Sequence, residues 1–211
     1  MIELADKWTR QPQRLTGAAG VGWDLLWSAA APLVNQATGK TVAPVVPTRP
    51  GAAGQWADYQ STSAAQSFPV PSASSYTLYV VLAHPAASTG SLGRILSNGS
   101  AGVRLEAYTT GGGVYLNTTH TGVAGGVSFV TGVGSFDTKP WTYVITYDGT
   151  TQRGWLRDSS GLISEASPAT IGISTPSQVD FGYLGGASCG LYAAGWRRGA
   201  RPTVRTRRHG S

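Results

Sequence analysis

Hydrophobic and polar positions alternate along much of the sequence from residue 75 onward. Residues 103–110, VRLEAYTT, alternate with a period of two, and residues 75–84, SYTLYVVLAH, are rich in β-branched and aromatic side chains. The first pattern is typical of a half-buried strand and the second of a buried strand. Further strands are predicted at residues 93–99, 114–120, 127–136, 141–149, 154–161, 179–186 and 190–196.

The segment from residue 141 to residue 157 gives the clearest local prediction. In WTYVITY (141–147), the aromatic residues and Ile145 fall on one face of a strand, and the remaining residues fall on the other. The dipeptide Asp-Gly that follows is a turn sequence. We therefore expect residues 153–157 to return as the second strand of an antiparallel hairpin.

The first 75 residues carry a weaker pattern. Residues 1–20 show no sustained period and contain a proline and a glycine cluster, which indicates an extended segment. A short strand is predicted around residues 23–28 and a turn at residues 35–39. The prolines of VAPVVPTRP (42–50) exclude a central strand, because proline cannot donate to a sheet ladder. Residues 56–68 are small and polar, and strand-like at best.

Short strands at regular spacing, with almost no helical period, predict an all-β fold: a two-sheet antiparallel jelly-roll sandwich. The 29 glycines, 12 prolines and 12% charged residues suit many short strands joined by turns. The single cysteine, Cys189, excludes an intramolecular disulfide. We expect an N-terminal arm over residues 1–19, the jelly-roll domain over 20–196 and an arginine-rich arm over 197–211. The predicted buried positions are Tyr79, Val81, Tyr143, Ile145, Leu156 and Leu184.

The net charge of +6 is concentrated at the C-terminus. Residues 1–14 carry a net charge of +1 and residues 15–196 a net charge of −1, whereas residues 197–211 contain six arginines and no acid. A nucleic-acid-binding fold spreads its basic residues over a folded face. We therefore expect no specific nucleic-acid binding. The arginines instead suit a docking arm that pairs with carboxylates of a neighbouring subunit.

Two stretches resemble a known family. KPWTYVITYDGTTQRGWLRDSSG (139–161) and VDFGYLGGASCGLYAAGW (179–196) are similar to the laminin-G-like, concanavalin A-like jelly roll. In that family a Trp-led strand, a Tyr-Asp-Gly turn, a return strand, a Leu-Gly-Gly step and a closing strand recur, and SYTLYVVLAHP resembles an earlier strand. The resemblance covers roughly residues 60–196. The arginine tail departs from the family, in which a short helix often follows.

The opening motifs WTRQPQR and GWDLLWS resemble the start of virion proteins of tailed bacteriophages that carry this domain. This resemblance implies a structural role in a virion, as a capsid decoration, minor capsid or tail-associated protein. The implied partners are other virion proteins, with further copies of this chain left open. Neither a long apolar run nor a signal-peptide core is visible, so we expect assembly in the host cytoplasm and no membrane partner.

Catalytic patterns in the sequence are incomplete. Residues 186–190, GASCG, fit the G-x-S-x-G pattern, but no acid follows Ser188 and the one later histidine is His209. A glycosidase needs two carboxylates held about 5–10 Å apart, for example on alternate residues of a strand. No two acids lie within two positions of each other, and the glutamates are few: Glu3, Glu106 and Glu165. We therefore expect no enzymatic activity.

Metal and cofactor motifs are equally sparse. Three isolated histidines and one cysteine give no zinc spacing. Relatives of this fold often hold calcium, for which Asp148 or Asp158 would serve, although an aspartate in a turn more often bonds the local backbone. We expect no cofactor.

The expected function is therefore docking to neighbouring virion subunits through both termini. Trp8, an isolated aromatic on an extended segment, suits an anchor in a pocket of a neighbouring subunit. The alternative is a lectin-like, carbohydrate-binding module that recognises a glycan of the host surface. The candidate partner-binding residues are Trp8, Arg10, Arg14, Arg197, Arg198, Arg201, Arg205, Arg207 and Arg208.

Overall fold

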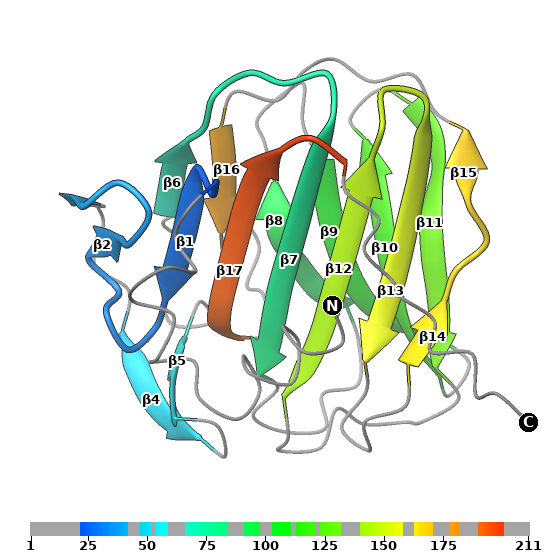
Figure 1. The fold of residues 1–211 in the computed structure, drawn as a ribbon. Coiled ribbons are helices and arrows are strands. Elements are labelled where there is room, and N and C mark those ends of the chain that lie inside the picture. The colour runs from blue at the N-terminus through cyan, green and yellow to red at the C-terminus, as the bar shows by residue number, and fades with distance from the viewer. Residues whose placement is uncertain are drawn as a thin grey trace, which may run out of the picture.

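The computed structural model describes a set of strands and their connecting turns (Figure 1). Every regular element among the described residues is a β-strand, and every strand pairing is antiparallel. No helix in this part of the chain could cross a membrane. The described residues are 22–41, 47–51, 54–58, 66–83, 91–97, 103–110, 113–120, 123–131, 140–157, 163–170, 178–181 and 190–200.

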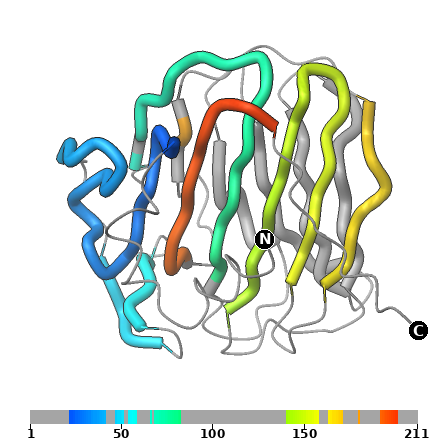
Figure 2. The backbone as a smooth tube through the Cα atoms, in the orientation of Figure 1, coloured from blue at the N-terminus to red at the C-terminus, as the bar shows by residue number. Residues whose placement is uncertain are grey.

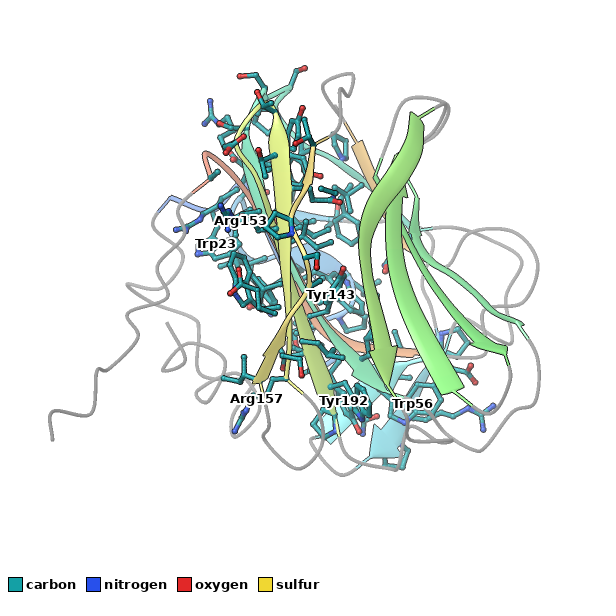
Figure 3. The ribbon with its side chains drawn as sticks, turned by 90° about the vertical axis from the view of Figure 1, so that its right-hand side faces the viewer. Trp23, Trp56, Tyr143, Arg153, Arg157 and Tyr192 are labelled. Carbon is teal, nitrogen blue, oxygen red and sulfur yellow. The ribbon has the colours of Figure 1, made fainter. Side chains whose placement is uncertain are left out.

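The strands form two large sheets that face each other, together with a small hairpin (Figure 3). The nine-stranded sheet has the order β14-β13-β12-β7-β17-β5-β4, with β1 paired to β17 and β15 paired to β13. Its strands are β1 (Leu25–Ser28), β4 (Thr48–Gly51), β5 (Gly54–Ala57), β7 (Tyr76–Ala83), β12 (Trp141–Tyr147), β13 (Thr151–Arg157), β14 (Ile163–Glu165), β15 (Ala169–Thr170) and β17 (Gly190–Arg198).

The six-stranded sheet has the order β11-β10-β9-β8-β16-β6. The separate hairpin joins β2 (Val34–Asn35) to β3 (Lys40–Thr41). The strands of the six-stranded sheet are β6 (Gln66–Pro69), β8 (Ser91–Ser97), β9 (Val103–Thr110), β10 (Gly113–His120), β11 (Val123–Thr131) and β16 (Gln178–Phe181).

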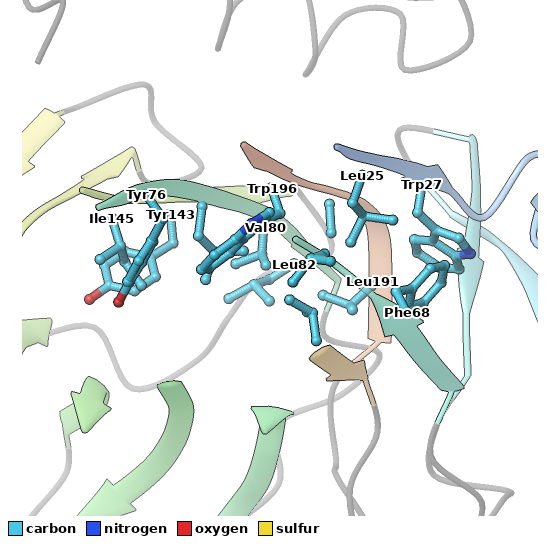
Figure 4. Close-up of a cluster of buried hydrophobic side chains, with 14 of the residues drawn as sticks. Leu25, Trp27, Phe68, Tyr76, Val80, Leu82, Tyr143, Ile145, Leu191 and Trp196 are labelled. Carbon is cyan, nitrogen blue, oxygen red and sulfur yellow. The ribbon is translucent and has the colours of Figure 1, made fainter. Parts of the chain in front are cut away.

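The main core lies between the two sheets (Figure 4). Alternate residues of β7 and β12 point into it, because successive side chains of a strand point to opposite faces. The ring of Trp196 stacks on Tyr76 with centroids 4.3 Å apart, and burial raises the pKa of the Tyr76 hydroxyl far above its ordinary value. We call this side of the nine-stranded sheet the inner face, and the opposite side the outer face.

The predicted buried positions are divided between the two faces. Tyr143, Ile145 and Leu156 belong to the core between the sheets, as the alternation predicted. Tyr79 and Val81 are also buried, but in a second cluster on the outer face. These five predictions are confirmed, and Leu184 lies outside the described residues.

The predicted two-sheet antiparallel sandwich is confirmed, with several strand boundaries shifted. Strand β9 matches its prediction, whereas β11 begins at Val123 and β13 at Thr151, earlier than expected. Strands β14 and β15 were not anticipated from the pattern. Strand β4 contains Pro50 and lies at the sheet edge, where a missing N–H donor is tolerated.

Candidate docking site

The candidate partner-binding residues that the structure describes are Arg197 and Arg198. They are the last two residues of β17, where they pair with Thr77 and Tyr76 of β7. The predicted arm of residues 197–211 therefore begins inside the sheet. The other candidates lie outside the described residues: Trp8, Arg10, Arg14, Arg201, Arg205, Arg207 and Arg208.

Two hydrogen bonds continue this pairing beyond β17. The backbone N–H of Gly199 donates to the carbonyl of Ser75 at 2.9 Å. The hydroxyl of Thr77 donates to the carbonyl of Gly199, also at 2.9 Å. The chain is thus held to the body as far as Gly199, three residues beyond the domain boundary expected from the sequence.

Arg198 forms an ion pair with Asp24, a residue that was not among the candidates from the sequence. Nη2 of Arg198 lies 3.1 Å from Oδ1 of Asp24, and Nε of Arg198 donates to Oδ2 at 3.3 Å. The backbone N–H of Arg198 donates to the same Oδ2 at 3.0 Å. Asp24 is fixed in turn, because its own N–H donates to the carbonyl of Trp196. This fork geometry is the bidentate pairing that favours arginine over lysine.

Arg197 lies on the outer face, over an aromatic pair. Its guanidinium carbon is 5.2 Å from the ring centroid of Trp23, within the range of a cation–π contact. Trp23 meets Tyr79 edge to face at 5.2 Å and 88°. The ring of Tyr79 covers Gly195, where an added Cβ would overlap it. Burial raises the pKa of the Tyr79 hydroxyl, so this group stays neutral at physiological pH.

The first and last long strands of the described chain, β1 and β17, lie side by side (Figure 2). Residues 22–24 lead into β1, which pairs with β17 and places Leu25 opposite Trp196. Gly22 and Gly199 both have φ of +85°, a left-handed conformation that favours glycine. The sequence shows two separate ends, whereas the sheet brings their bases together through a contact between residues 174 positions apart.

The described residues include no cluster of three or more histidine, cysteine, aspartate or glutamate side chains that could hold a metal ion. The calcium candidate Asp148 lies in the exposed turn after β12, where its Oδ1 accepts the N–H groups of Thr150 and Thr151. These hydrogen bonds to the backbone lower the pKa of Asp148. The other candidate, Asp158, lies outside the described residues.

The residues of the catalytic patterns are mostly outside the described ranges. This applies to residues 186–189, which include Ser188, and to His209. Glu106 lies in β9, opposite Asn117 of β10 and Arg94 of β8. Glu165 ends β14, and its carboxylate lies 3.8 Å from the guanidinium of Arg153.

No protein-family model and no curated protein matches the sequence. Several solved structures match its fold. The receptor-binding domain of botulinum neurotoxin mosaic serotype C/D superposes with a TM-score of 0.55 at 7% identity, over 86% of this chain and 48% of that one. The exoplasmic/lumenal domain of VIP36, in its Ca²⁺/Man2-bound form, superposes with a TM-score of 0.51 at 8% identity, over 85% and 90%.

A third match is the binding domain of botulinum neurotoxin DC in complex with rat synaptotagmin II. It superposes with a TM-score of 0.52 at 9% identity, over 86% of this chain and 49% of that one. Identities this low carry information about fold alone. Together with the sheet topology, they show that the chain is a concanavalin A-like jelly-roll sandwich.

Proposed function

We propose that the protein is a non-enzymatic structural component of a bacteriophage virion that docks to neighbouring subunits through its terminal segments. The observation that carries this proposal is the shared base of the two segments beside β1 and β17. A partner that contacts one segment is within reach of the other. The sequence resemblance to virion proteins of tailed phages supports the virion as the assembly in which the protein acts, and we place its assembly in the host cytoplasm.

The arginine-rich C-terminal segment is the principal docking element in this proposal. Arg198 is paired with Asp24, and Arg197 lies over Trp23, so both are engaged within the body. The arginines of residues 201–211 follow directly, with no acid among them. Each exposed charge pair contributes only about 0–1 kcal/mol, whereas partly desolvated bidentate pairs contribute more. A segment anchored as far as Gly199 also has fewer conformations to lose on binding.

Replacement of the four arginines in residues 201–211 by glutamine tests the docking proposal. The variant should fold with the same far-ultraviolet circular dichroism spectrum, because no side chain of the described core is changed. Its incorporation into particles should fall at least tenfold, and rising salt should release the wild-type protein. The matched control replaces the same arginines by lysine, which keeps the charge but loses the guanidinium fork. Full occupancy by the glutamine variant would rule out docking through this segment.

Recognition of a host-surface glycan is the second candidate function. It is favoured by the likeness to the VIP36 domain, whose structure is described as a Ca²⁺/Man2-bound form. Screening the full chain against a glycan array, with and without calcium, tests it. Glycan binding that persists in the glutamine variant would assign recognition to the jelly-roll body, and no binding at millimolar glycan would exclude it.

A further inference from the structure

The outer face of the nine-stranded sheet carries a continuous row of apolar residues. Strand pairing places Trp155 of β13 opposite Val144 of β12, and Val144 opposite Tyr79 of β7. The row continues through Gly195 of β17 to Leu26 of β1. Because strands are about 4.8 Å apart, these five strands span about 20 Å. Such a row is ordinarily a packing surface rather than a solvated one.

Several outer-face residues are buried, although no described strand covers them at β12 and β13 (Figure 3). Thr142 and Thr146 of β12 are exposed by only 3% and 4%. The loops around the small hairpin cover a different part of the face, through the contacts of Leu26 and Ala37. The part formed by β12 and β13 therefore needs a covering group that the described residues do not supply.

Two buried polar atoms identify the chemistry of that covering group. The hydroxyl of Thr142 and the indole nitrogen of Trp155 have no hydrogen-bond partner among the described residues. Both residues belong to the outer face, because their neighbours Tyr143 and Leu156 point into the core. A buried polar group without a hydrogen-bond partner destabilises the fold. A backbone in extended conformation, with its carbonyl groups available, would satisfy both.

The positive charge of the outer face at β13 limits which segment could cover it. Arg153, Trp155 and Arg157 alternate along β13 on the outer face, and Figure 3 shows Arg153 on the same side as Trp23. The ion pair of Arg153 with Glu165 is long, and both side chains are about half exposed. A segment that combines apolar residues with carboxylates fits this surface. A segment that carries only basic residues would be repelled.

We propose that residues 1–21 of the same chain cover the outer face over β12 and β13. This segment ends at Val21, and Gly22 connects it to Trp23, which already packs on Tyr79 of the row. Its first eight residues carry the apolar Ile2, Leu4 and Trp8 and two acids, Glu3 and Asp6, against one base, Lys7, and further bases follow only after Trp8. Trp8 precedes Gly22 by 14 positions, so an extended chain reaches about 45 Å, well beyond the width of the row.

Competing occupants fit less well. Residues 201–211 follow β17 in the sequence, but they hold four arginines, a histidine and no acid that could pair with Arg153 or Arg157. A segment from another molecule competes with one whose effective concentration is in the millimolar range because it is tethered. Trp8 then anchors the N-terminal segment to its own domain, whether or not the C-terminal segment docks to a neighbour.

Cysteine labelling tests this proposal on the full chain. Val144→Cys, in a Cys189→Ser background, places one thiol in the covered part of the row. We expect its rate of reaction with a maleimide dye to rise at least tenfold when Leu4→Asp and Trp8→Ala are added. Ile163→Cys is the matched control, because Ile163 is 37% exposed and its rate should not change. Thr142→Cys replaces Val144→Cys if the latter alters the circular dichroism spectrum.

A disulfide then distinguishes the occupants. Leu4→Cys combined with Val144→Cys should give a crosslink within one chain, which runs as a monomer on a non-reducing gel. A crosslinked dimer would overturn the proposal and assign the face to the segment of a second copy. Failure to crosslink, with labelling unaffected by Leu4→Asp and Trp8→Ala, would also overturn it. Neither result depends on particle incorporation, so docking through the C-terminal segment stands or falls separately, whereas a confirmed intrachain cover would remove the N-terminal segment from the proposed docking.

Discussion

The two faces of the nine-stranded sheet are built from the same strands but are stabilised differently. On the inner face, large aromatic rings pack against each other: Tyr76 stacks on Trp196, and Trp27 meets Phe68 with centroids 6.3 Å apart. On the outer face the buried cluster is smaller and depends on a glycine, because the ring of Tyr79 occupies the space above Gly195. Because successive side chains of a strand point to opposite faces, β7, β12 and β17 each contribute residues to both environments.

Hydrogen bonding adds a second difference between the faces. Asn35 of the small hairpin accepts the N–H of Leu26 with its Oδ1 at 3.0 Å, and its Nδ2 donates to the carbonyl of Asp24 at the same distance. These bonds fix a loop over the outer face at β1. The inner face is covered by a whole sheet, whereas the outer face is covered by individual contacts. Substitutions on the outer face should therefore have more local effects on stability, and a second substitution should compensate them more easily.

Removal of a large inner-face ring should have the largest effect on stability. Trp196→Ala deletes a fully buried side chain that stacks on Tyr76, and it leaves a cavity between the sheets. Substitutions of this kind cost about 3–5 kcal/mol. We expect a loss of that size in the free energy of unfolding, measured by urea denaturation. A loss below 1 kcal/mol would mean that the inner face is not the main core.

Addition of a methyl group to the outer face should have an intermediate effect. Gly195→Ala forces a Cβ into the ring of Tyr79, and we expect overpacking of this kind to cost about 1–3 kcal/mol. Because the ring is the obstacle, Tyr79→Leu should remove most of the penalty. A double-mutant cycle by denaturation measures this coupling. Additive effects of the two substitutions would show that Gly195 is required for another reason.

The sequence was sufficient to predict the central strands. In residues 141–147 the alternation, followed by Asp-Gly, defines β12 and the turn, and the predicted burial of Tyr143 and Ile145 is confirmed. These signals are local, because period and turn chemistry act over a few residues. The same pattern assigned Tyr79 and Val81 to the interior but could not show that they belong to a different cluster.

The end of β17 and the short edge strands could not be predicted in the same way. Arg197 and Arg198 read as part of a basic tail, and only the contact with Asp24, far away in sequence, shows that they belong to the sheet. Strand β14 has no alternation of its own and exists through pairing with β13. Long-range contacts decide such cases, and a linear pattern does not contain them.

The turn between β12 and β13 lies at the end of these two strands. Substitution in this turn should have the smallest effect on stability. Asp148→Ala removes the carboxylate that accepts the N–H groups of Thr150 and Thr151. The turn is exposed, so we expect a loss of no more than about 1 kcal/mol at pH 7. Asp148→Asn, which keeps an acceptor oxygen, should lose less. A loss comparable to that of Trp196→Ala would mean that the turn, rather than the packed inner face, controls the stability of the sheet.

The same aspartate predicts how this small contribution depends on pH. Its hydrogen bonds to the backbone lower its pKa in the folded state, so the folded form holds the ionised carboxylate more favourably than the unfolded chain does. The contribution is therefore present above the unfolded pKa of about 3.9 and is lost as the pH falls through the lower, folded value. Urea denaturation at pH 7 and near pH 3 should show a wild-type stability that exceeds that of Asp148→Ala by less at the acidic pH. A difference that grows on acidification would contradict this assignment, because it would require the protonated carboxyl to be the form that the turn prefers.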